Sequence, residues 1–336
     1  MVTQEADTDA QVTPEAILAV ATGFMAAKHL FVANEIGLFS ALADGPLSLD
    51  ELAERTGVPR ASVRILADAM AALGFVAREG DRYRNQPVSQ VFLSGQTPAD
   101  LRPGLRVFDR ISYPTWMHLE EAIRTRRGVR GELSPEQTEI RCRGIEAITA
   151  GAAHALAQSY DFAQRQRILD LGGGLGFFLR ILAQHYPELE ATLFEMPAVA
   201  AIARRALAGA PEGERIAVVE GDFFHDPIPP GHDTVLLANV IHLFSPEHNR
   251  ELLSRIRSGV VPGTTLLLVD FWTDASHTQP VFAALMAGEW LAVTGEADCY
   301  SVEEVGDWLH HTGWTMNVHQ PLAGPASLIV AQARAE

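Results

Sequence analysis

A glycine-rich segment at residues 170–176, Asp-Leu-Gly-Gly-Gly-Leu-Gly, follows a short apolar run and precedes an apolar pattern typical of a helix. Strand, glycine turn and helix form the first half of a nucleotide-binding βαβ unit, where glycines let the backbone approach a ligand closely. A dinucleotide site has the spacing Gly-x-Gly-x-x-Gly, but Phe177 stands where the last glycine would be. We therefore expect Asp170, Gly172 and Gly174 to bind a ligand with a cationic end and no phosphate. The alternative is a glycine-rich turn in another α/β fold.

Polar residues also follow the next predicted strands, at 191–194 and 216–219. Glu195 comes 25 residues after Asp170, where an acid at the end of the second strand reaches ribose hydroxyls. Gly221, Asp222 and Phe223 follow the third strand. Asp222 can accept a hydrogen bond from an adenine amino group, and the Phe223 ring can lie flat against the base. Because the carboxyl ends of parallel strands share one edge of a sheet, the pattern predicts a nucleoside site there.

The chain resembles class I S-adenosylmethionine-dependent methyltransferases. More narrowly, it resembles small-molecule O-methyltransferases of the acetylserotonin and caffeate type and their bacterial antibiotic-tailoring relatives. The matching segments are 169–174, Glu195, 221–223 and 240–242. The resemblance covers nearly the whole chain and implies S-adenosylmethionine as the cofactor. Asn239 follows the fourth predicted strand, at 234–237, and completes the expected cofactor-binding residues, although many members carry Arg or Lys near this position.

The resemblance also identifies His242 as the general base that removes the proton of an acceptor hydroxyl. An imidazole suits this role because it changes protonation near neutral pH. Asp270, at the end of a fifth predicted strand at 266–269, takes the place of a glutamate that flanks the base in the family. Cys299 falls at the second flanking acid, and Glu296 or Asp298 remains open as a substitute. Leu and Phe follow His242 instead of the aspartate and tryptophan of many members, so we expect no metal.

Aromatic and sulfur-containing side chains cluster at two places that can line an acceptor pocket. The alternative for each is ordinary core packing. The residues are Phe108, Tyr113, Trp116 and Met117 in one segment and Met286 and Trp290 in another.

The chain has 336 residues and a net charge of −16, from 42 acids and 26 Lys and Arg. This balance disfavours nucleic acid and anionic membranes as partners. The N-terminus lacks the basic region of a signal peptide, and no apolar run is expected to span a membrane. Two cysteines without a pairing pattern favour a cytoplasmic protein.

Residues 38–94 have the pattern of a winged helix-turn-helix, with a capped helix start at Ser48 and Glu51. This segment holds six Arg, no Lys and seven acids, so it lacks the basic face that DNA binding requires. In the resembled family this fold joins two subunits. We expect a disordered tail at 1–12, a dimerisation domain at 13–100, a helical pocket region at 101–165 and a catalytic domain at 166–336.

The sequence thus predicts a doubly wound, Rossmann-like α/β methyltransferase sheet with an N-terminal helical winged-helix domain. The expected activity is methylation of a hydroxyl on a small aromatic or polyketide-like secondary metabolite by a homodimer. The alternative is a C-methyltransferase, or a methyltransferase-like enzyme with a non-methylating reaction. A regulatory protein built on the winged helix is disfavoured by the acidic charge.

Overall fold

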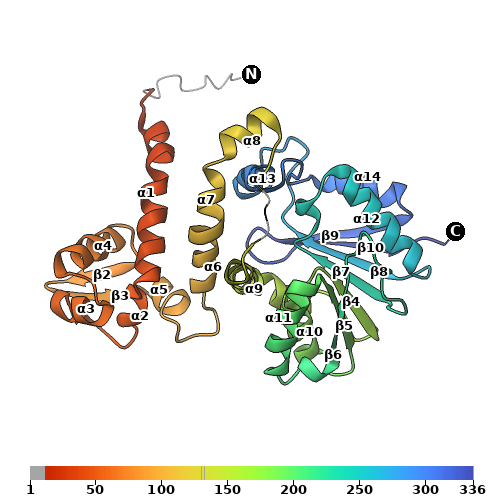
Figure 1. Cartoon of the computed structure of the whole chain (residues 1–336), viewed down its shortest axis with the longest axis horizontal. Coiled ribbons are helices and arrows are strands. Elements are labelled where there is room, and N and C mark those ends of the chain that lie inside the picture. Colours follow the sequence, from red (N-terminus) through yellow and green to blue (C-terminus); the bar gives the residue numbers. More distant parts are fainter. Residues whose placement is uncertain (1–11, 130, 132, 336) are drawn as a thin grey trace, which may run out of the picture. The chain divides into compact units, whose positions relative to one another are not determined.

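The computed structural model describes residues 12–129, 131 and 133–335, in two compact units of residues 1–105 and 106–336 (Figure 1). The predicted tail at 1–12 lies outside the described residues, except for Val12. The segment predicted as a helical pocket region, 101–165, falls mostly in the second unit.

The first unit contains the predicted winged helix. A capping box starts helix α3 (Leu49–Thr56), because the Ser48 side chain accepts from the Glu51 NH while the Glu51 carboxylate accepts from the Ser48 NH. Gly57, with φ 65°, ends that helix. A small antiparallel sheet of order β1-β3-β2 forms the wing. The elements are α2 Leu38–Ala41, β1 Leu47–Ser48, α3 Leu49–Thr56, α4 Arg60–Ala72, β2 Val76–Glu79, β3 Arg82–Asn85 and α5 Pro87–Phe92.

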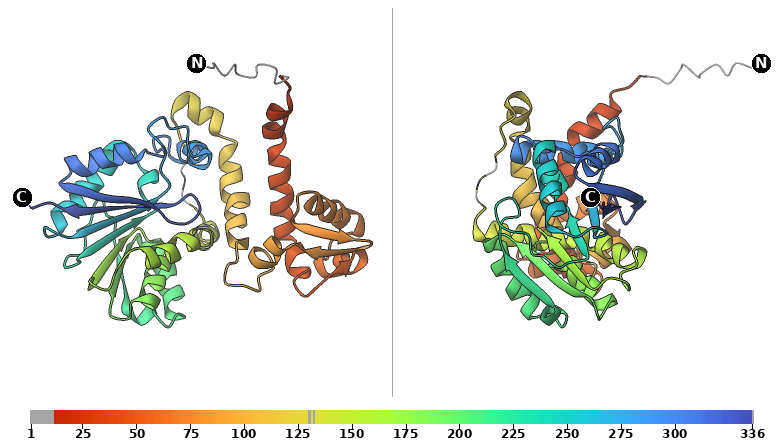
Figure 2. Two further views of the ribbon diagram at one scale, coloured as in Figure 1. Left: turned by 180° about the vertical axis from the view of Figure 1, so that it is seen from behind. Right: turned by 90° about the vertical axis from the view of Figure 1, so that its right-hand side faces the viewer.

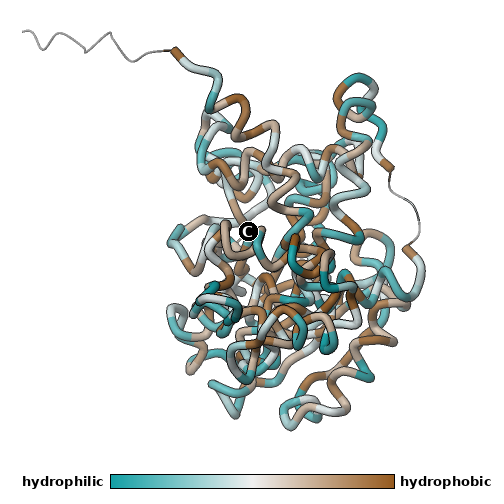
Figure 3. The backbone as a smooth tube through the Cα atoms, turned by 90° about the vertical axis from the view of Figure 1, so that its left-hand side faces the viewer, coloured by the Kyte–Doolittle hydropathy of each residue, from teal (hydrophilic) through white to brown (hydrophobic). Residues whose placement is uncertain are grey.

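Helix α1 (Glu15–Glu35) precedes the winged helix and leaves most of its apolar side chains outside the core. Ile17 is 72 % exposed and Val20 is 84 % exposed. Figure 3 shows apolar residues recurring along this helix, next to the grey N-terminal trace. The expectation that no apolar run reaches membrane length was wrong, because an 18-residue window of this 21-residue helix has a mean hydropathy of 1.7. Length and composition alone would let it cross a membrane; they equally suit a helix that packs against another protein.

The second unit is built on a seven-stranded sheet of order β6-β5-β4-β7-β8-β10-β9. The first five of these strands pair in parallel, and β10 is antiparallel to both β8 and β9. This confirms the predicted doubly wound sheet, which ends in an antiparallel hairpin of β9 and β10. The strands are β4 Arg167–Leu171, β5 Glu190–Glu195, β6 Ile216–Glu220, β7 Thr234–Ala238, β8 Thr265–Asp270, β9 Trp314–Pro321 and β10 Ser327–Ala333.

Both faces of this sheet are covered by helices, as Figure 2 shows. Ile168 packs with the α9, α10 and α11 side, and its neighbour Leu169 packs with the α12 and α14 side. Strands buried on both faces read as continuous apolar runs, which explains β7 and β8. The helices are α9 Pro135–Ser159, α10 Phe177–His185, α11 Pro197–Ala208, α12 Pro246–Gly259, α13 Val281–Thr294 and α14 Val302–His311.

A helical stretch before the sheet changes its winding in the middle. Helix α6 (Arg102–Val107) leads into a π-helical turn at Phe108–Ser112, then α7 (Tyr113–Trp116) and, after a break, α8 (Leu119–Thr125). Within the second unit, α7 and α8 pack against α13. π-helical turns are rare and often occur at functional sites, so the region where this turn approaches α13 is a candidate for a functional site.

Candidate active site

The glycine turn after β4 has the backbone conformation that requires glycine. Gly172, Gly174 and Gly176 have φ of 75°, 62° and 79°, which side chains with a Cβ rarely adopt. Gly172 donates from its NH to the Phe194 carbonyl at 2.9 Å, which ties the turn to the neighbouring strand β5. Nothing lies within 4 Å of the position that a Gly174 Cβ would take, so the turn is open on that side.

Asp170 lies beneath this turn and is fully buried. A Cβ on Gly173 would come within 2.1 Å of the Asp170 Oδ2 atom, so only glycine permits this packing. Neither carboxyl oxygen has a hydrogen-bond partner within the described part of the chain. Burial, together with the nearby Glu195 carboxylate, raises the pKa of Asp170 to about 8. A buried carboxyl without partners is costly, so this site fits a ligand that brings a hydrogen-bond donor or a cation.

Glu195 closes the other side of the turn from the end of β5. Its Oε1 accepts from the Gly174 NH at 3.2 Å, and its Oε2 accepts from the Met196 NH at 2.6 Å. Burial raises the pKa of Glu195, although these two hydrogen bonds oppose the shift. Each carboxylate oxygen keeps a further acceptor position, which suits the hydroxyls of a ribose.

The segment after β6 lies against the same turn. The Phe223 ring is 3.4 Å from the position that a Gly172 Cβ would take, and Gly221 leaves room for the Phe194 ring. Asp222 accepts from the Phe224 NH at 2.8 Å and bonds to His225 Nδ1 at 2.9 Å. Burial would raise the pKa of Asp222, but these hydrogen bonds outweigh it and lower the pKa overall. Asp222 is therefore a charged acceptor that is held in place by its own loop.

Asn239 follows β7 in a left-handed conformation with φ 58°, which asparagine tolerates better than most residues. Its NH donates to the Val269 carbonyl of β8 at 2.8 Å. This strained residue turns the chain sharply at the strand end and leads it towards His242.

His242 lies in a short 3₁₀ turn, Ile241–Leu243, and is 4 % exposed. Its Nδ1 bonds to Asp270 Oδ1 at 2.6 Å. Asp270 ends β8, is 1 % exposed, and accepts a second hydrogen bond from the Phe271 NH at 2.9 Å. The pair therefore fixes which imidazole nitrogen faces the carboxylate and leaves Nε2 for another partner. The structure thus places His242 and Asp270 in direct contact.

Two aromatic rings stack on the His242 imidazole. The Phe271 ring lies 4.9 Å away at an interplanar angle of 21°, and the Trp290 ring lies 4.2 Å away at 15°. Phe271 and Trp290 also belong to a small apolar cluster with Ala283, Met286 and Cys299. The imidazole is therefore held in an apolar environment in which Asp270 is its hydrogen-bonded acid.

The candidates for the second flanking acid are engaged elsewhere. Cys299 is fully buried, and burial together with the Asp270 charge raises the pKa of its thiol, which stays neutral. Glu296 pairs with His248 at 3.1 Å. Asp298 accepts from the Cys299 NH at 2.7 Å. The structure thus places Cys299 in the apolar cluster around the base.

The predicted acceptor-pocket residues separate into two groups. Met286 and Trp290 lie on α13 in the cluster around His242. Trp116 lies against α13, because its ring is 3.1 Å from the position that a Gly288 Cβ would take. Phe108 and Tyr113 are half-buried at the two ends of the π-helical turn. Met117 is 77 % exposed, so the prediction that it lines the pocket is not supported by its position in this protomer.

Sequence reasoning missed Glu289. This acid is 5 % exposed and forms hydrogen bonds with Ser112 and Trp116, and burial raises its pKa. It connects α13 to the π-helical turn and α7. A signal was present, since Glu289 is the one charged residue in the apolar stretch 281–294.

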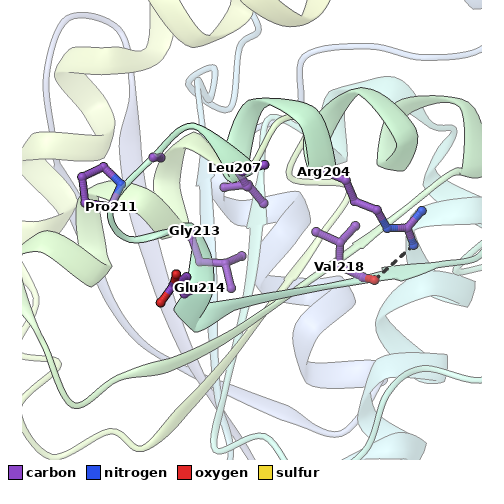
Figure 4. A pocket seen from close by; sticks show the side chains of 9 residues that line it. Arg204, Leu207, Pro211, Gly213, Glu214 and Val218 are labelled. Carbon is purple, nitrogen blue, oxygen red and sulfur yellow. Dashed lines mark hydrogen bonds between the residues drawn. The ribbon is translucent and has the colours of Figure 1, made fainter.

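A depression of about 350 Å³ lies elsewhere, beside α11 and β6. Figure 4 shows Arg204 there, reaching across Val218 to donate to its carbonyl at 3.3 Å. Its lining strand residues, Ile216 and Val218, precede the carboxyl end of β6. Ligands of open α/β sheets bind beyond the carboxyl ends, so this depression is separate from the site.

The sheet order and the glycine turn define a class I S-adenosylmethionine-dependent methyltransferase. Residues 131–306 match the O-methyltransferase domain family, and residues 18–95 match the O-methyltransferase dimerisation domain. The chain belongs to this O-methyltransferase family and is an S-adenosylmethionine-dependent enzyme.

Relatives in two Streptomyces species align along most of the chain. A 3-hydroxy-5-methyl-1-naphthoate 3-O-methyltransferase of Streptomyces sahachiroi is 32 % identical over 89 % of this chain and 89 % of its own length. The tetracenomycin polyketide synthesis 8-O-methyl transferase TcmO of Streptomyces glaucescens is 29 % identical over 95 % of this chain and 96 % of its own. The structure of human N-acetylserotonin methyltransferase with S-adenosylmethionine superimposes with a TM-score of 0.89, at 25 % identity over 100 % of both chains.

Proposed function

We propose that the protein methylates a hydroxyl of a small aromatic or polyketide-like metabolite, with His242 as the general base. The observation that carries this proposal is the buried His242–Asp270 pair, joined at 2.6 Å in an otherwise apolar cluster. The relatives' names, a naphthoate O-methyltransferase and a polyketide O-methyl transferase, support the acceptor class.

The residues that would hold the cofactor surround the glycine turn. S-adenosylmethionine supplies a methyl group that its sulfonium has already activated. The open side of Gly174 leaves room for the part of the cofactor that lies against the turn, and Asp170 offers a carboxyl to its cationic end. Glu195 suits the ribose. The residues that would border the adenine are Gly221, Asp222, Phe223 and Asn239.

His242 would act through Nε2. Asp270 orients the imidazole and stabilises the positive charge that it gains with the acceptor proton. Asp270 need not itself be protonated in the reaction. Orientation of the acceptor against the methyl donor supplies the remainder of the acceleration, because the reacting groups are held together.

The acceptor and the base can be tested together. The purified protein is incubated with S-adenosylmethionine and a panel of hydroxynaphthoates, phenols and polyketide-like aromatics, and products are analysed by mass spectrometry and NMR. We expect a methyl ether, and we expect His242→Ala to lower turnover by about 10²–10⁴-fold on that acceptor. His248→Ala is the matched control and should retain activity. A product methylated at carbon, formed by His242→Ala at a normal rate, would replace this proposal with C-methylation.

We further propose a homodimer that forms through the first unit. The exposed apolar side chains of α1 support it, together with the dimerisation-domain match at residues 18–95. Phe24→Glu should place a charge on that helix and shift the protein towards monomer in sedimentation velocity at micromolar concentration. A wild-type monomer under these conditions contradicts the proposal. Two buried free cysteines, Cys142 and Cys299, support a reducing, cytoplasmic location.

A further inference from the structure

The two rings stacked on His242 cover both faces of its imidazole. Phe271 and Trp290 are each close to parallel with it, at 4.9 Å and 4.2 Å. One face of an imidazole has no room for two near-parallel rings at such distances, so they occupy opposite faces. With Nδ1 held by Asp270, the edge that carries Nε2 is the one left for an acceptor.

When His242 takes up a proton, Asp270 is the acid that stabilises the positive charge of the imidazolium through a hydrogen bond. Asp270 is the acid bonded to it, and the neighbouring Cys299 thiol is neutral because burial raises its pKa. An aromatic face attracts a cation through its quadrupole, and indole does so best among the aromatic side chains. Trp290 is also the closer of the two rings to His242.

Contacts with other segments hold helix α13 in place on both sides of Trp290 along the chain. Gly288 is packed against the Trp116 ring, and the buried Glu289 bonds to Ser112 and Trp116. At the other end of the helix, the Val129 NH donates to the Ala292 carbonyl at 2.9 Å. The residue before Trp290 and the residue two positions after it are therefore both anchored, which limits movement of the indole.

We propose that Trp290 is a positioning residue of the base, in addition to any contact it makes with the acceptor. Its indole fixes the imidazole plane and stabilises the imidazolium. In the step concerned, the acceptor O–H proton moves to Nε2 as the oxygen forms its bond to the methyl carbon. The electron pair of the broken sulfur–carbon bond stays on sulfur, so the positive charge passes from sulfur to the imidazole. This inference rests on His242 being the base.

The test compares Trp290→Leu and Trp290→Phe with the wild type across pH. Removing the indole face should lower kcat about tenfold and move the acidic limb of the kcat profile to lower pH by up to about one unit. Trp290→Phe keeps an aromatic ring and should restore most of kcat and most of the position of the acidic limb. Trp308→Leu removes a buried tryptophan of the same unit that packs edge-on against Tyr300, and it should leave the acidic limb in place.

The outcomes separate this inference from the proposed function. If Trp290→Leu raises only KM for the acceptor and leaves the acidic limb unmoved, Trp290 is a pocket wall and the inference is overturned. The same holds if Trp290→Phe behaves like Trp290→Leu, since a ring would then give no benefit. If His242→Ala retains a near-normal rate, the base itself fails. Circular dichroism of each variant identifies loss of folding, and the Phe variant then decides.

Discussion

Two buried aspartates lie at the carboxyl ends of strands of the same sheet, Asp170 one residue before the end of β4 and Asp270 at the end of β8. Their surroundings differ. Asp270 accepts from His242 and from the Phe271 NH, whereas Asp170 has no partner in the described chain. The protein bonds Oδ1 of Asp270 and leaves only its Oδ2 without a hydrogen-bond partner in the described chain, whereas both oxygens of Asp170 lack one. Equal burial thus supports two functions, orientation of a base and recognition of a cation.

Of the two aspartates, Asp270 should show the larger effect when its carboxylate is removed. Asp270→Ala leaves the His242 ring without its Nδ1 partner, so the imidazole loses both orientation and charge stabilisation. We expect kcat to fall about 10²-fold, with the affinity for S-adenosylhomocysteine unchanged. Steady-state kinetics and calorimetry measure the two quantities. A normal kcat would show that the pair is structural only.

Removing the charge of Asp170 should instead weaken ligand binding. Asp170→Asn keeps the side-chain shape but loses the charge that attracts a cationic ligand. We expect S-adenosylhomocysteine to bind about 30-fold more weakly, equivalent to about 2 kcal/mol, by calorimetry at pH 8. Unchanged affinity would remove Asp170 from the cofactor site.

The stability of that variant provides the control. The pKa of Asp170 is about 8 in the folded chain and returns to its ordinary range on unfolding, so the native state binds more protons between these values. The neutral carboxyl of Asp170 contributes to the free energy of unfolding at low pH, and this contribution is therefore lost as the pH rises through 8. Asp170→Asn should consequently raise the free energy of unfolding at pH 8, by about 2 kcal/mol. A loss of stability would indicate that the weaker binding reflects damage to the fold.

The affinity of the wild-type protein should depend on pH for the same reason. With the pKa of Asp170 at about 8, the carboxyl is mostly protonated at pH 6.5 and must release its proton to meet a cation. Affinity for S-adenosylhomocysteine should rise up to about tenfold per pH unit towards pH 8 and then level off. Asp170→Asn should flatten this slope. A wild-type slope that persists in the variant would assign the titration to another group.

Glu195 should show the smallest effect, because it combines both situations. It is bonded to the Gly174 and Met196 NH groups and still has acceptor positions for a ligand. Glu195→Gln keeps one acceptor oxygen and replaces the other with a donor. We expect about a tenfold loss of S-adenosylhomocysteine affinity, or about 1.4 kcal/mol. Adenine alone should bind the variant and the wild type equally, and an equal loss for adenine would argue against ribose contact.

The sequence predicted the positions in this comparison but not their difference. Apolar runs ending in Asp170, Glu195 and Asp270 predict acids along one edge of a parallel sheet, since strand order and direction bring those ends together. Whether a carboxylate finds a partner depends on side-chain packing between distant segments, such as His242 against Asp270. That information is absent from local patterns.

The same limit explains the residues that were missed or misplaced. The stack of Trp290 on His242 and the burial of Glu289 against Ser112 arise from contacts between α13 and segments far away in the chain. Met117 was grouped with Trp116 because they are neighbours in sequence, yet adjacent helical residues point in different directions. The apolar length of α1 was underestimated because alanines and a glycine separate its larger aliphatic residues.

The central claim is that His242 and Asp270 act as one unit in removing the acceptor proton, and a double-mutant cycle on kcat tests it most directly. The account predicts a loss of about 10³-fold for His242→Ala and about 10²-fold for Asp270→Ala. Since Asp270 acts only through the base, the double variant should match His242→Ala within about twofold. A double variant whose loss is the product of the two, about 10⁵-fold, would contradict the account.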